Sequence, residues 1–413
     1  MGSKKVVTGI DIGTTKIAVI IAECSNNIFE KIVGYGEAPS LGLKKGVVES
    51  IDLTVKSIHK AVEIAEKQAK IKVNSAYIGI TGDHIRSLNN TGVISINNSK
   101  SSSTGGKISS KDIEKVLDHA KSISLSSDRR ILHVITKDFK VDDRQGIKDP
   151  IGLYGHRLEA NVHLITLGVN YKKDLKTCLE NAGITPASFV LEPYASSLSV
   201  LNYDQKELGV ILIDIGGGTT DIVVYFRNRI QYSTAIPLGG ESVTNDILYK
   251  FQIGKGEAEK IKIKHGVAKT ALSDENKNFK IRNSIDSKEI EISQKDLSDI
   301  IEPRMREIFK FCNNEISKSE INREYTYGIV LTGGGALLKG CSDLAAEIFN
   351  ISVSIGKPIN VKKIKNDLDN PRYATSLGLI NFGIQNQDKP INNKNNFSIK
   401  MIDKIKNFLN ELY

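Results

Sequence analysis

The sequence lacks the cysteine and histidine spacings of disulfide and metal sites. It has four cysteines in 413 residues, and no two of them form a Cys-x-x-Cys pair: Cys24, Cys178, Cys312 and Cys341. Isolated cysteines argue against a disulfide framework or a zinc site and are typical of a reducing compartment. His156 and His163 flank the start of an expected strand, and no His-Glu-x-x-His occurs. We therefore interpret the histidines as core or surface residues and not as metal ligands.

The sequence also lacks an uninterrupted apolar run of the length that spans a bilayer. The apolar stretch after Lys4 and Lys5 is broken by Asp11 and Lys16, and no small-residue cleavage site follows it. This pattern argues against a signal peptide, and we expect a cytoplasmic protein. A chain of 413 residues is too long for one compact core, so we expect two or more domains.

Positive charge is in excess, with a formal net charge of +9. Such an excess indicates an acidic partner, either nucleic acid or an anionic membrane face. A background bias toward Lys, Asn and Ile explains the same excess without any partner. The net charge by itself therefore leaves these interpretations open.

The most informative feature that is present is an internal repeat. Residues 9–20 contain Asp-Ile-Gly-Thr-Thr-Lys, and residues 211–224 contain Asp-Ile-Gly-Gly-Gly-Thr-Thr-Asp. Each copy has an apolar strand, an Asp, a turn with Gly and Thr-Thr, and a second β-branched strand. This pattern predicts a β-hairpin in each copy. The repeat indicates a duplicated domain in which each lobe carries one phosphate-facing turn.

Between and after the hairpins, strands alternate with helices, which indicates an α/β protein with mixed sheets. We expect a helix over residues 110–125 with Ser110 as its N-cap. Another helix is expected from Ala336, after a strand and the run Gly333-Gly334-Gly335. Polar composition predicts two loops and one disordered tether, over residues 97–107, 273–288 and 385–396 respectively.

The two hairpin turns have the composition of a phosphate site. Glycine lets backbone N–H groups point at one region without a Cβ in the way, and clustered N–H donors bind phosphate oxygens. Threonine hydroxyls add donors, and Lys16 adds a positive charge. We expect Asp11 and Asp214 to hold Mg²⁺ through its waters, since this ion keeps much of its hydration shell. The residues assigned to a triphosphate are Gly13, Thr14, Thr15, Lys16, Gly216, Gly217, Gly218, Thr219 and Thr220.

A third glycine cluster completes the predicted site. Gly333, Gly334 and Gly335 allow a flat ring such as adenine to approach the backbone closely. The cluster is not a P-loop, because no Gly-Lys-Ser/Thr follows at the required spacing. One such cluster alone is common, but three in this order indicate a nucleotide site.

These elements resemble the phosphate-1, phosphate-2 and adenosine motifs of the actin, Hsp70 and sugar-kinase superfamily, which implies ATP with Mg²⁺ as the ligand. The stretch Leu191-Glu192-Pro193-Tyr194-Ala195-Ser196-Ser197 is similar to the connecting motif of bacterial actins. The acidic residue of that motif faces the attacking water, so Glu192 is a candidate catalytic residue together with Asp214. A buried, ion-paired glutamate is the alternative. The resemblance implies a weak ATPase at most, because such proteins use nucleotide mainly to set conformation.

Further stretches resemble the bacterial cell-division family FtsA and together cover nearly the whole chain. They are Thr81-Gly82-Asp83-His84-Ile85, Asp149-Pro150-Ile151-Gly152-Leu153, Arg157-Leu158-Glu159-Ala160, Pro237-Leu238-Gly239-Gly240, Lys264-His265-Gly266 and Ile301-Glu302-Pro303-Arg304. The resemblance implies a duplicated actin-like ATPase fold: two lobes with mixed β-sheets flanked by helices, plus a C-terminal amphipathic helix. The implied parts are the first lobe core (1–84 and 165–205, with part of 364–384), a relocated inserted subdomain (85–164), the second lobe core (206–226 and 306–363), a small subdomain (227–305), the linker (385–396) and a membrane-targeting helix (397–413).

The same resemblance implies partners. In that family the relocated subdomain mediates head-to-tail polymerisation, so self-assembly is expected through residues 85–164. Arg304 lies in a region that resembles the docking site for the acidic C-terminal tail of the tubulin homologue FtsZ, and arginine pairs well with carboxylates. A solvated arginine on a helix surface is the alternative. Other division proteins are expected as partners, and nucleic acid is not.

Residues 397–413 have the pattern of an amphipathic helix. At about 1.5 Å per residue they form a rod of roughly 25 Å, and their charges forbid spanning a bilayer. A position in the interface suits them, with lysines near anionic headgroups of the inner membrane. Packing onto the protein's own core is the alternative. The residues assigned to the membrane are Phe397, Met401, Ile402, Lys404, Ile405, Lys406, Phe408, Leu409 and Leu412.

Together these features predict an ATP-binding protein that polymerises on the cytoplasmic face of the cell membrane and tethers FtsZ filaments at the division septum. Two alternatives remain open. An actin-fold small-molecule kinase would need a catalytic Asp over a substrate pocket and has no use for the terminal helix. A pilus-assembly adaptor like PilM resembles the chain in its nucleotide motifs but lacks the tethered helix.

Overall fold

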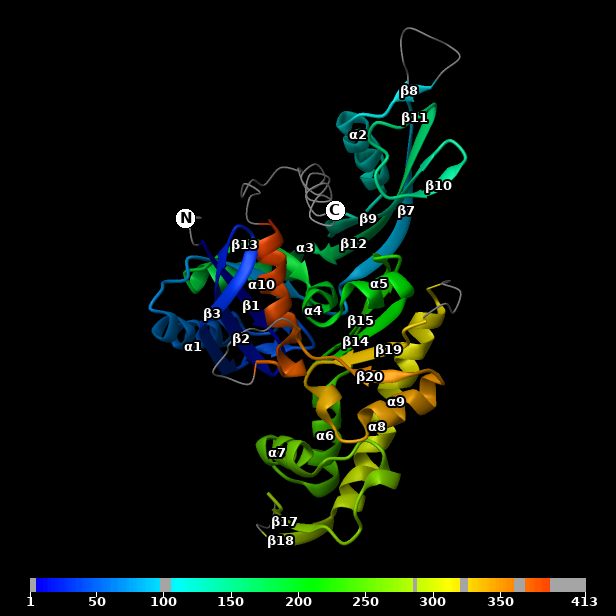
Figure 1. Ribbon diagram of the computed structural model, residues 1–413. Helices are drawn as coiled ribbons and strands as arrows, with labels where there is room; N and C mark the ends of the chain where they lie inside the picture. Colours follow the sequence, from blue (N-terminus) through cyan, green and yellow to red (C-terminus); the bar gives the residue numbers. More distant parts are fainter. Residues whose placement is uncertain (1–4, 97–104, 285–287, 320–325, 360–367, 387–413) are drawn as a thin grey trace.

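Two five-stranded sheets form the centres of two lobes in the computed structural model (Figure 1). The structure describes residues 5–96, 105–284, 288–319, 326–359 and 368–386. Within these residues no helix is both long and apolar enough to cross a membrane.

The first sheet has the strand order β13-β6-β1-β2-β3. β1, β2 and β3 form an antiparallel meander, whereas β6 is parallel to both β1 and β13. Helices α1 and α3 pack on one face, and α4 and α10 cross each other on the opposite face. The bounds are β1 Lys5–Ile12, β2 Lys16–Ser25, β3 Ile28–Pro39, α1 Ile51–Ala69, β6 Ser75–Ile80, α3 Val169–Asn181, β13 Thr185–Leu191, α4 Glu192–Val200 and α10 Ala374–Asn386.

The second sheet repeats this topology with the order β16-β15-β14-β19-β20. An antiparallel meander is again followed by two parallel strands, so the prediction of a duplicated α/β fold with mixed sheets is confirmed. The bounds are α5 Tyr203–Leu208, β14 Val210–Ile215, β15 Thr220–Phe226, β16 Arg229–Ile236, β19 Ile329–Thr332, α9 Cys341–Phe349 and β20 Val353–Ile355.

Two smaller parts extend from opposite ends of the lobes (Figure 1). One is the inserted subdomain, which has the sheet order β10-β9-β12-β7, a small β11-β8 pair and a core under α2. Its elements are β7 Arg86–Ser95, β8 Gly106–Lys107, α2 Ser110–Lys121, β9 Arg129–Val141, β10 Arg144–Ile147, β11 Tyr154–Gly155 and β12 Arg157–Gly168. The other part contains α6 Gly240–Phe251, α7 Lys255–His265, β17 Asn278–Arg282, β18 Glu289–Ser293 and the long α8 Gln294–Ser317.

The short remaining elements lie in the connections. They are β4 Leu43–Lys44, β5 Val47–Val48 and three single turns of 3₁₀-helix at Thr270–Leu272, Gly335–Leu337 and Pro371–Tyr373.

Several local predictions were wrong. Ser109, not Ser110, is the N-cap of α2, because Asp112 completes a capping box with it, and the helix ends at Lys121. No α-helix begins at Ala336, which lies in a 3₁₀-turn before α9. The predicted loop 273–288 contains β17, which forms because it pairs with β18.

Some predictions concern residues only partly covered by the structure. Gln385 and Asn386, at the start of the predicted tether, belong to α10. The rest of the tether, the helix predicted over 397–413 and the polar part of the 97–107 loop lie outside the described residues. The domain limits stay predictions; β16 falls in the range given to the small subdomain yet pairs with β15 in the core sheet.

Candidate nucleotide-binding site

The turns of the two repeated hairpins meet between the lobes. A Cβ built on Gly217 would lie 2.4 Å from Thr15 Cγ2, and one on Gly218 would lie 2.3 Å from Thr14 Oγ1. Residues separated by about two hundred positions are therefore in direct contact, as the repeat predicted. At Gly218 the contact requires glycine, since an added Cβ would also lie 2.8 Å from Thr14 Cβ and 2.9 Å from Lys45 Cα.

The two turns have the same backbone hydrogen bond. Gly13 N donates to Lys16 O at 3.0 Å, and Gly216 N donates to Thr219 O at 2.9 Å. Lys16 therefore corresponds to Thr219 in the fold, and Thr14 and Thr15 correspond to Gly217 and Gly218. The repeat of Thr-Thr pairs in the sequence is not the structural alignment of the two turns.

Thr219 and Thr220, which stay predicted phosphate ligands, already form hydrogen bonds within the protein. Thr219 Oγ1 donates to Asp221 Oδ2 at 3.1 Å, and Thr220 Oγ1 donates to Leu238 O at 2.8 Å. Both hydroxyl groups therefore donate their hydrogen to acceptors within the protein. Thr15, in contrast, is exposed, and Thr14 Oγ1 only accepts a hydrogen bond, from Gly46 N at 3.1 Å.

The two aspartates end equivalent strands and are bound by neighbouring residues of one helix. In the first turn of α10, Ser376 Oγ donates to Asp11 Oδ2 at 3.2 Å, and Thr375 Oγ1 donates to Asp214 Oδ2 at 3.2 Å. Ser196 Oγ of α4 also donates to Asp214 Oδ2, at 2.5 Å. The start of α10 therefore holds one carboxylate from each lobe, where the helix dipole favours negative charge.

Four buried carboxylates share this region, and their charges repel one another. Burial raises the pKa of Asp214 to about 6, and the charge of Asp11 adds to the rise. Burial likewise raises the pKa of Asp221 to about 7, with Asp214 and Asp11 adding to it. The pKa of Glu192 is raised by burial and by the same three aspartates. A site with this much unbalanced negative charge favours a cation.

Lys16 faces these carboxylates. Its Nζ lies 3.6 Å from Asp11 Oδ2 and 4.9 Å from the centroid of the Tyr373 ring. Tyr373 OH donates to Glu37 Oε2 at 3.1 Å, which fixes the ring. The Lys16 ammonium is buried and donates no hydrogen bond to any described residue. An ammonium group has three donors, so this one fits a phosphate oxygen as its missing acceptor.

The third glycine cluster lies beside the second turn because β19 is parallel to β14, which pairs Thr332 with Asp214. Gly333 has a φ of +85°, and a Cβ there would lie 2.2 Å from Asp214 Oδ1. A Cβ on Gly335 would lie 2.3 Å from Ile215 Cγ2. Gly334, in contrast, faces open space, because an added Cβ there would have no atom of the described residues within 4 Å. One side of the cluster is therefore available for a flat ring.

Gly334 gives a sharp test of this arrangement. Gly334→Val is expected to leave the free energy of unfolding within about 0.5 kcal/mol of the wild-type value, because the added atoms meet open space. ATP affinity is expected to fall at least about tenfold, since the side chain occupies the place of the ring. Calorimetric titration with ATP and urea unfolding check the two parts. An unchanged affinity in the folded variant would place the ring elsewhere.

The residues fit a hydrated magnesium ion better than a directly ligated metal. Among the described residues, no three His, Cys, Asp or Glu side chains converge closely enough to hold a metal ion. Asp11 and Asp214 nevertheless come from the two lobes and are bound by adjacent residues of α10. Contact through water, which Mg²⁺ retains, is compatible with this geometry.

Comparison with known proteins identifies the family. Residues 211–378 match the family model of cell division protein FtsA, and residues 82–166 match the SHS2 domain inserted in FtsA. The chain is 38% identical to cell division protein FtsA of Pseudomonas aeruginosa over 385 residues, covering 93% of this chain and 91% of the relative. It belongs to the FtsA family. The FtsA of Borreliella burgdorferi is 36% identical over the full length of both chains, and that of Escherichia coli is 33% identical over 92% of this chain and 90% of its own.

Solved structures confirm the actin-like fold of this FtsA-family chain. A PilM–PilN type IV pilus biogenesis complex contains a chain with a TM-score of 0.65 and 15% identity, which covers 92% of this chain and 98% of that chain. MreB5 of Spiroplasma citri bound to ADP has a TM-score of 0.56 and 14% identity, over 94% of this chain and 99% of its own. At these identities the likeness shows the fold alone.

Several residues of the candidate site were not predicted from the sequence. Ser196 lies in the stretch that resembles the connecting motif, and Asp221 directly follows the second Thr-Thr pair, so both motifs contain a signal for these two residues. Thr375, Ser376 and Tyr373 belong to no local pattern. They reach the site because α10 packs against β1 and α4.

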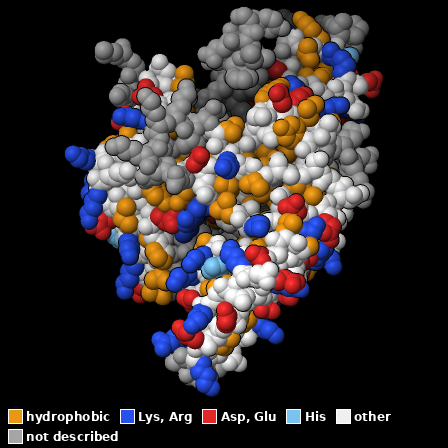
Figure 2. Space-filling view, turned by 60° about the horizontal axis from the view of Figure 1, so that its bottom comes forward, with side chains coloured by type: hydrophobic (Ala, Val, Ile, Leu, Met, Phe, Trp, Pro, Cys, Tyr) orange, Lys and Arg blue, Asp and Glu red, His pale blue; other side chains and the backbone are white. Residues whose placement is uncertain are grey.

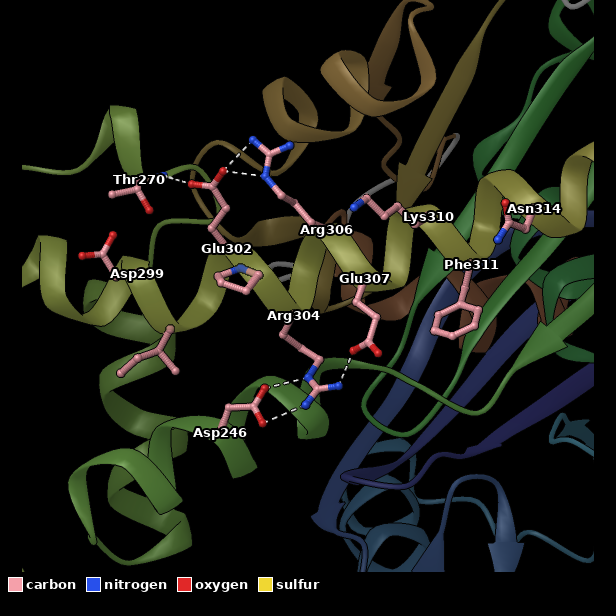
Figure 3. A pocket seen from close by; sticks show the side chains of 12 residues that line it. Asp246, Thr270, Asp299, Glu302, Arg304, Arg306, Glu307, Lys310, Phe311 and Asn314 are labelled. Atoms are coloured by element: carbon pink, nitrogen blue, oxygen red, sulfur yellow. Dashed lines mark hydrogen bonds and ion pairs between the residues drawn. The ribbon is translucent and has the colours of Figure 1, made fainter.

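Arg304, predicted to bind the FtsZ tail, lines a different cavity of about 1080 Å³ along α8 (Figure 3). Its guanidinium already forms a bidentate ion pair with Asp246 of α6, at 2.6 and 2.9 Å, and it also contacts Glu307. These bonds raise the pKa of Arg304. Arg306 is paired with Glu302 and Glu347. An acidic ligand at Arg304 would have to compete with two carboxylates of the protein itself.

Proposed function

We propose that this FtsA-family protein binds ATP with Mg²⁺ between its lobes, polymerises on the cytoplasmic face of the cell membrane and tethers FtsZ filaments at the division septum. The observation that carries the proposal is the contact of the two glycine turns beside the buried ammonium of Lys16. FtsA relatives are named as cell division proteins, and they match more than nine-tenths of this chain.

In this proposal the turns supply backbone N–H donors and Lys16 supplies a positive charge to the phosphates. Asp11 and Asp214 hold the hydrated Mg²⁺, whose charge offsets the crowding of four carboxylates. The ring of adenine lies over Gly334. Ser376 and Thr375 orient the two aspartates, so the start of α10 is hydrogen-bonded to a carboxylate of each lobe.

We assign Glu192 a role in positioning water and expect slow hydrolysis at most. Glu192 lies against Gly79, with its Oε1 3.2 Å from a Cβ built there, and it is buried. No ion pair to Glu192 is found among the described residues, which speaks against the alternative of a buried structural pair. A carboxyl whose pKa is raised by burial and by neighbouring aspartates is suited to accept a proton from water.

The cavity along α8 supports docking of the FtsZ tail, but with a different cation from the one predicted. Lys310 is exposed and forms no ion pair within the described part of the chain. Phe311 next to it is 45% exposed. We assign the tail's acidic and apolar side chains to Lys310 and Phe311, with Arg304 retained as a structural residue held by Asp246.

We assign membrane binding to residues 397–413 rather than to a basic patch. Figure 2 shows Lys and Arg side chains interspersed with Asp and Glu over one face of the molecule, so the net charge of +9 is not gathered there into a surface of one sign. A single amphipathic helix binds weakly, and an array of them on a polymer raises the effective concentration.

Sedimentation with anionic liposomes tests this function. With ATP and Mg²⁺, we expect the protein to pellet with the liposomes, and Phe408→Glu to reduce the bound fraction at least about tenfold, because it places a charge on the apolar arc. Asn407→Glu is the matched control on the polar side and is expected to pellet almost as the wild type does. Equal pelleting of Phe408→Glu and Asn407→Glu would refute membrane binding by this helix.

A further inference from the structure

The chain enters the inserted subdomain at a residue that is bonded to the opposite lobe. Thr81 directly follows β6 of the first lobe and precedes the stretch 82–166 that matches the inserted SHS2 domain. Its side chain is buried, and its Oγ1 donates a hydrogen bond to Asp221 Oδ1 on β15 of the second lobe. The base of the inserted subdomain is thus fastened to both lobes.

Asp221 belongs to the second hairpin, so this bond reaches the candidate nucleotide site. Asp221 pairs with Asp214 in the antiparallel register of β14 and β15. Its Oδ2 accepts from Thr219 Oγ1, which closes the second turn. One carboxylate therefore connects the second turn of the candidate nucleotide site with the entrance of the inserted subdomain.

The first hairpin is connected to Thr81 through Gly46, which lies in the turn between β4 and β5. A Cβ built on Gly46 would lie 2.9 Å from the carbonyl oxygen of Thr81, so the two backbones are in close contact. Gly46 N donates to Thr14 Oγ1 at 3.1 Å. If the distance between the two turns changes, either the packing of Thr81 against Gly46 or its hydrogen bond to Asp221 must therefore change as well.

Beyond Thr81, β7 and β12 of the inserted subdomain are also hydrogen-bonded to β16 of the second lobe. His163 Nε2 and Ser233 Oγ form a hydrogen bond of 2.9 Å, and Ser87 Oγ donates to Ser233 O at 2.5 Å. Arg129 holds the two connecting segments together, donating to His84 O at 2.9 Å and to Thr166 O at 3.2 Å. The subdomain therefore emerges from the first lobe but is also held by bonds to the second.

We propose that the Thr81–Asp221 hydrogen bond transmits the state of the nucleotide site to the inserted subdomain, with Thr81 as the positioning residue. The inference rests on the proposed binding of ATP between the turns. A ligand that fixes the turns fixes Asp221, and Asp221 fixes the entrance of the subdomain. The two lobes and the subdomain then adopt one relative arrangement, whereas without the ligand the bond opens and closes. A coupling of this kind is typically a 5- to 150-fold effect.

Hydrogen exchange of the full chain tests the coupling, at concentrations where no filaments pellet. In the wild type, ATP with Mg²⁺ is expected to slow exchange in β9 and β12 about fivefold or more. Thr81→Val removes the hydroxyl at nearly constant volume and is expected to reduce this ATP effect to less than about twofold. Thr81→Ser keeps the hydroxyl and is expected to restore it. Thr91→Val is the matched control, because the hydrogen bond of Thr91 Oγ1 to a described residue lies within the subdomain, to Asn161 Oδ1 at 2.7 Å.

The other possible outcomes contradict either the proposed coupling or the proposed function. If Thr81→Val responds to ATP as the wild type does, the proposal is overturned. The same holds if Thr81→Val no longer binds ATP in calorimetry, because Thr81 would then act in binding and not in coupling. A wild type that binds ATP without any change in β9 and β12 also overturns the coupling while leaving the proposed function intact. A wild type that binds no ATP overturns the proposed function itself.

Discussion

Gly218→Ala is expected to lower the affinity for ATP at least about a hundredfold, which corresponds to about 2.7 kcal/mol of binding free energy. The added methyl group would lie 2.3 Å from Thr14 Oγ1 and 2.9 Å from the backbone Cα of Lys45. The Thr14 hydroxyl can rotate away, but the backbone of Lys45 cannot yield without moving its loop. The two turns must then separate, and their N–H donors no longer converge on one phosphate group.

Calorimetric titration of ATP into Gly218→Ala measures this effect. Gly256→Ala is the control, because a Cβ at Gly256 meets no described atom within 4 Å and lies on α7, away from the turns. The control is expected to bind ATP as tightly as the wild type. Because the steric conflict is confined to the contact with Thr14 and Lys45, Gly218→Ala should still unfold cooperatively. A folded Gly218→Ala protein with unchanged affinity would show that the contact between the turns plays no part in binding.

Gly378→Ala is expected to destabilise the protein by about 3 kcal/mol or more. Gly378 lies in α10 where this helix crosses α4, and an added Cβ would lie 1.8 Å from Ala195 O and 2.3 Å from Ala195 C. Both atoms are backbone, so no side-chain rotation relieves the overlap. The helices must move apart, which opens a gap in the cluster that contains Val190, Leu379 and Phe382.

The same movement would disturb the candidate nucleotide site. Thr375 and Ser376 lie within one turn of Gly378 on α10 and bind Asp214 and Asp11. Gly378→Ala should therefore lose ATP affinity together with stability. Urea unfolding measures the stability, and Gly256→Ala again serves as the control, since alanine replaces glycine in a helix without steric conflict and gains up to about 1 kcal/mol. Equal unfolding midpoints for the two variants would contradict the close crossing of α10 and α4.

The proposed membrane contact and the proposed coupling concern different parts of the sequence. Residues 397–413 are assigned to the membrane from their sequence pattern alone, whereas Thr81 and Asp221 are assigned from a hydrogen bond between the lobes. Their tests are independent, because the liposome assay changes Phe408 and the exchange assay changes Thr81. Failure of either leaves the other standing.

By itself, the sequence determined the features that depend on residues close together in the chain. The hairpins at 9–20 and 211–224, the glycine run at 333–335 and the alternation of strands and helices follow from local periodicity and turn chemistry. The repeat also predicted that two lobes would bring their turns together. These features required only backbone propensities and the pattern of apolar residues.

Only the tertiary structure decided which distant groups satisfy one another. Thr375 and Ser376 reach the two aspartates because of how α10 packs, and Asp246 neutralises Arg304 from a helix 58 positions earlier in the chain. The matching backbone hydrogen bonds of the two turns place Lys16 at the position equivalent to Thr219, and pairing with β18 made a strand within 273–288. Such contacts depend on sheet register and helix crossing, which the long-range packing of the whole chain sets and no local pattern records.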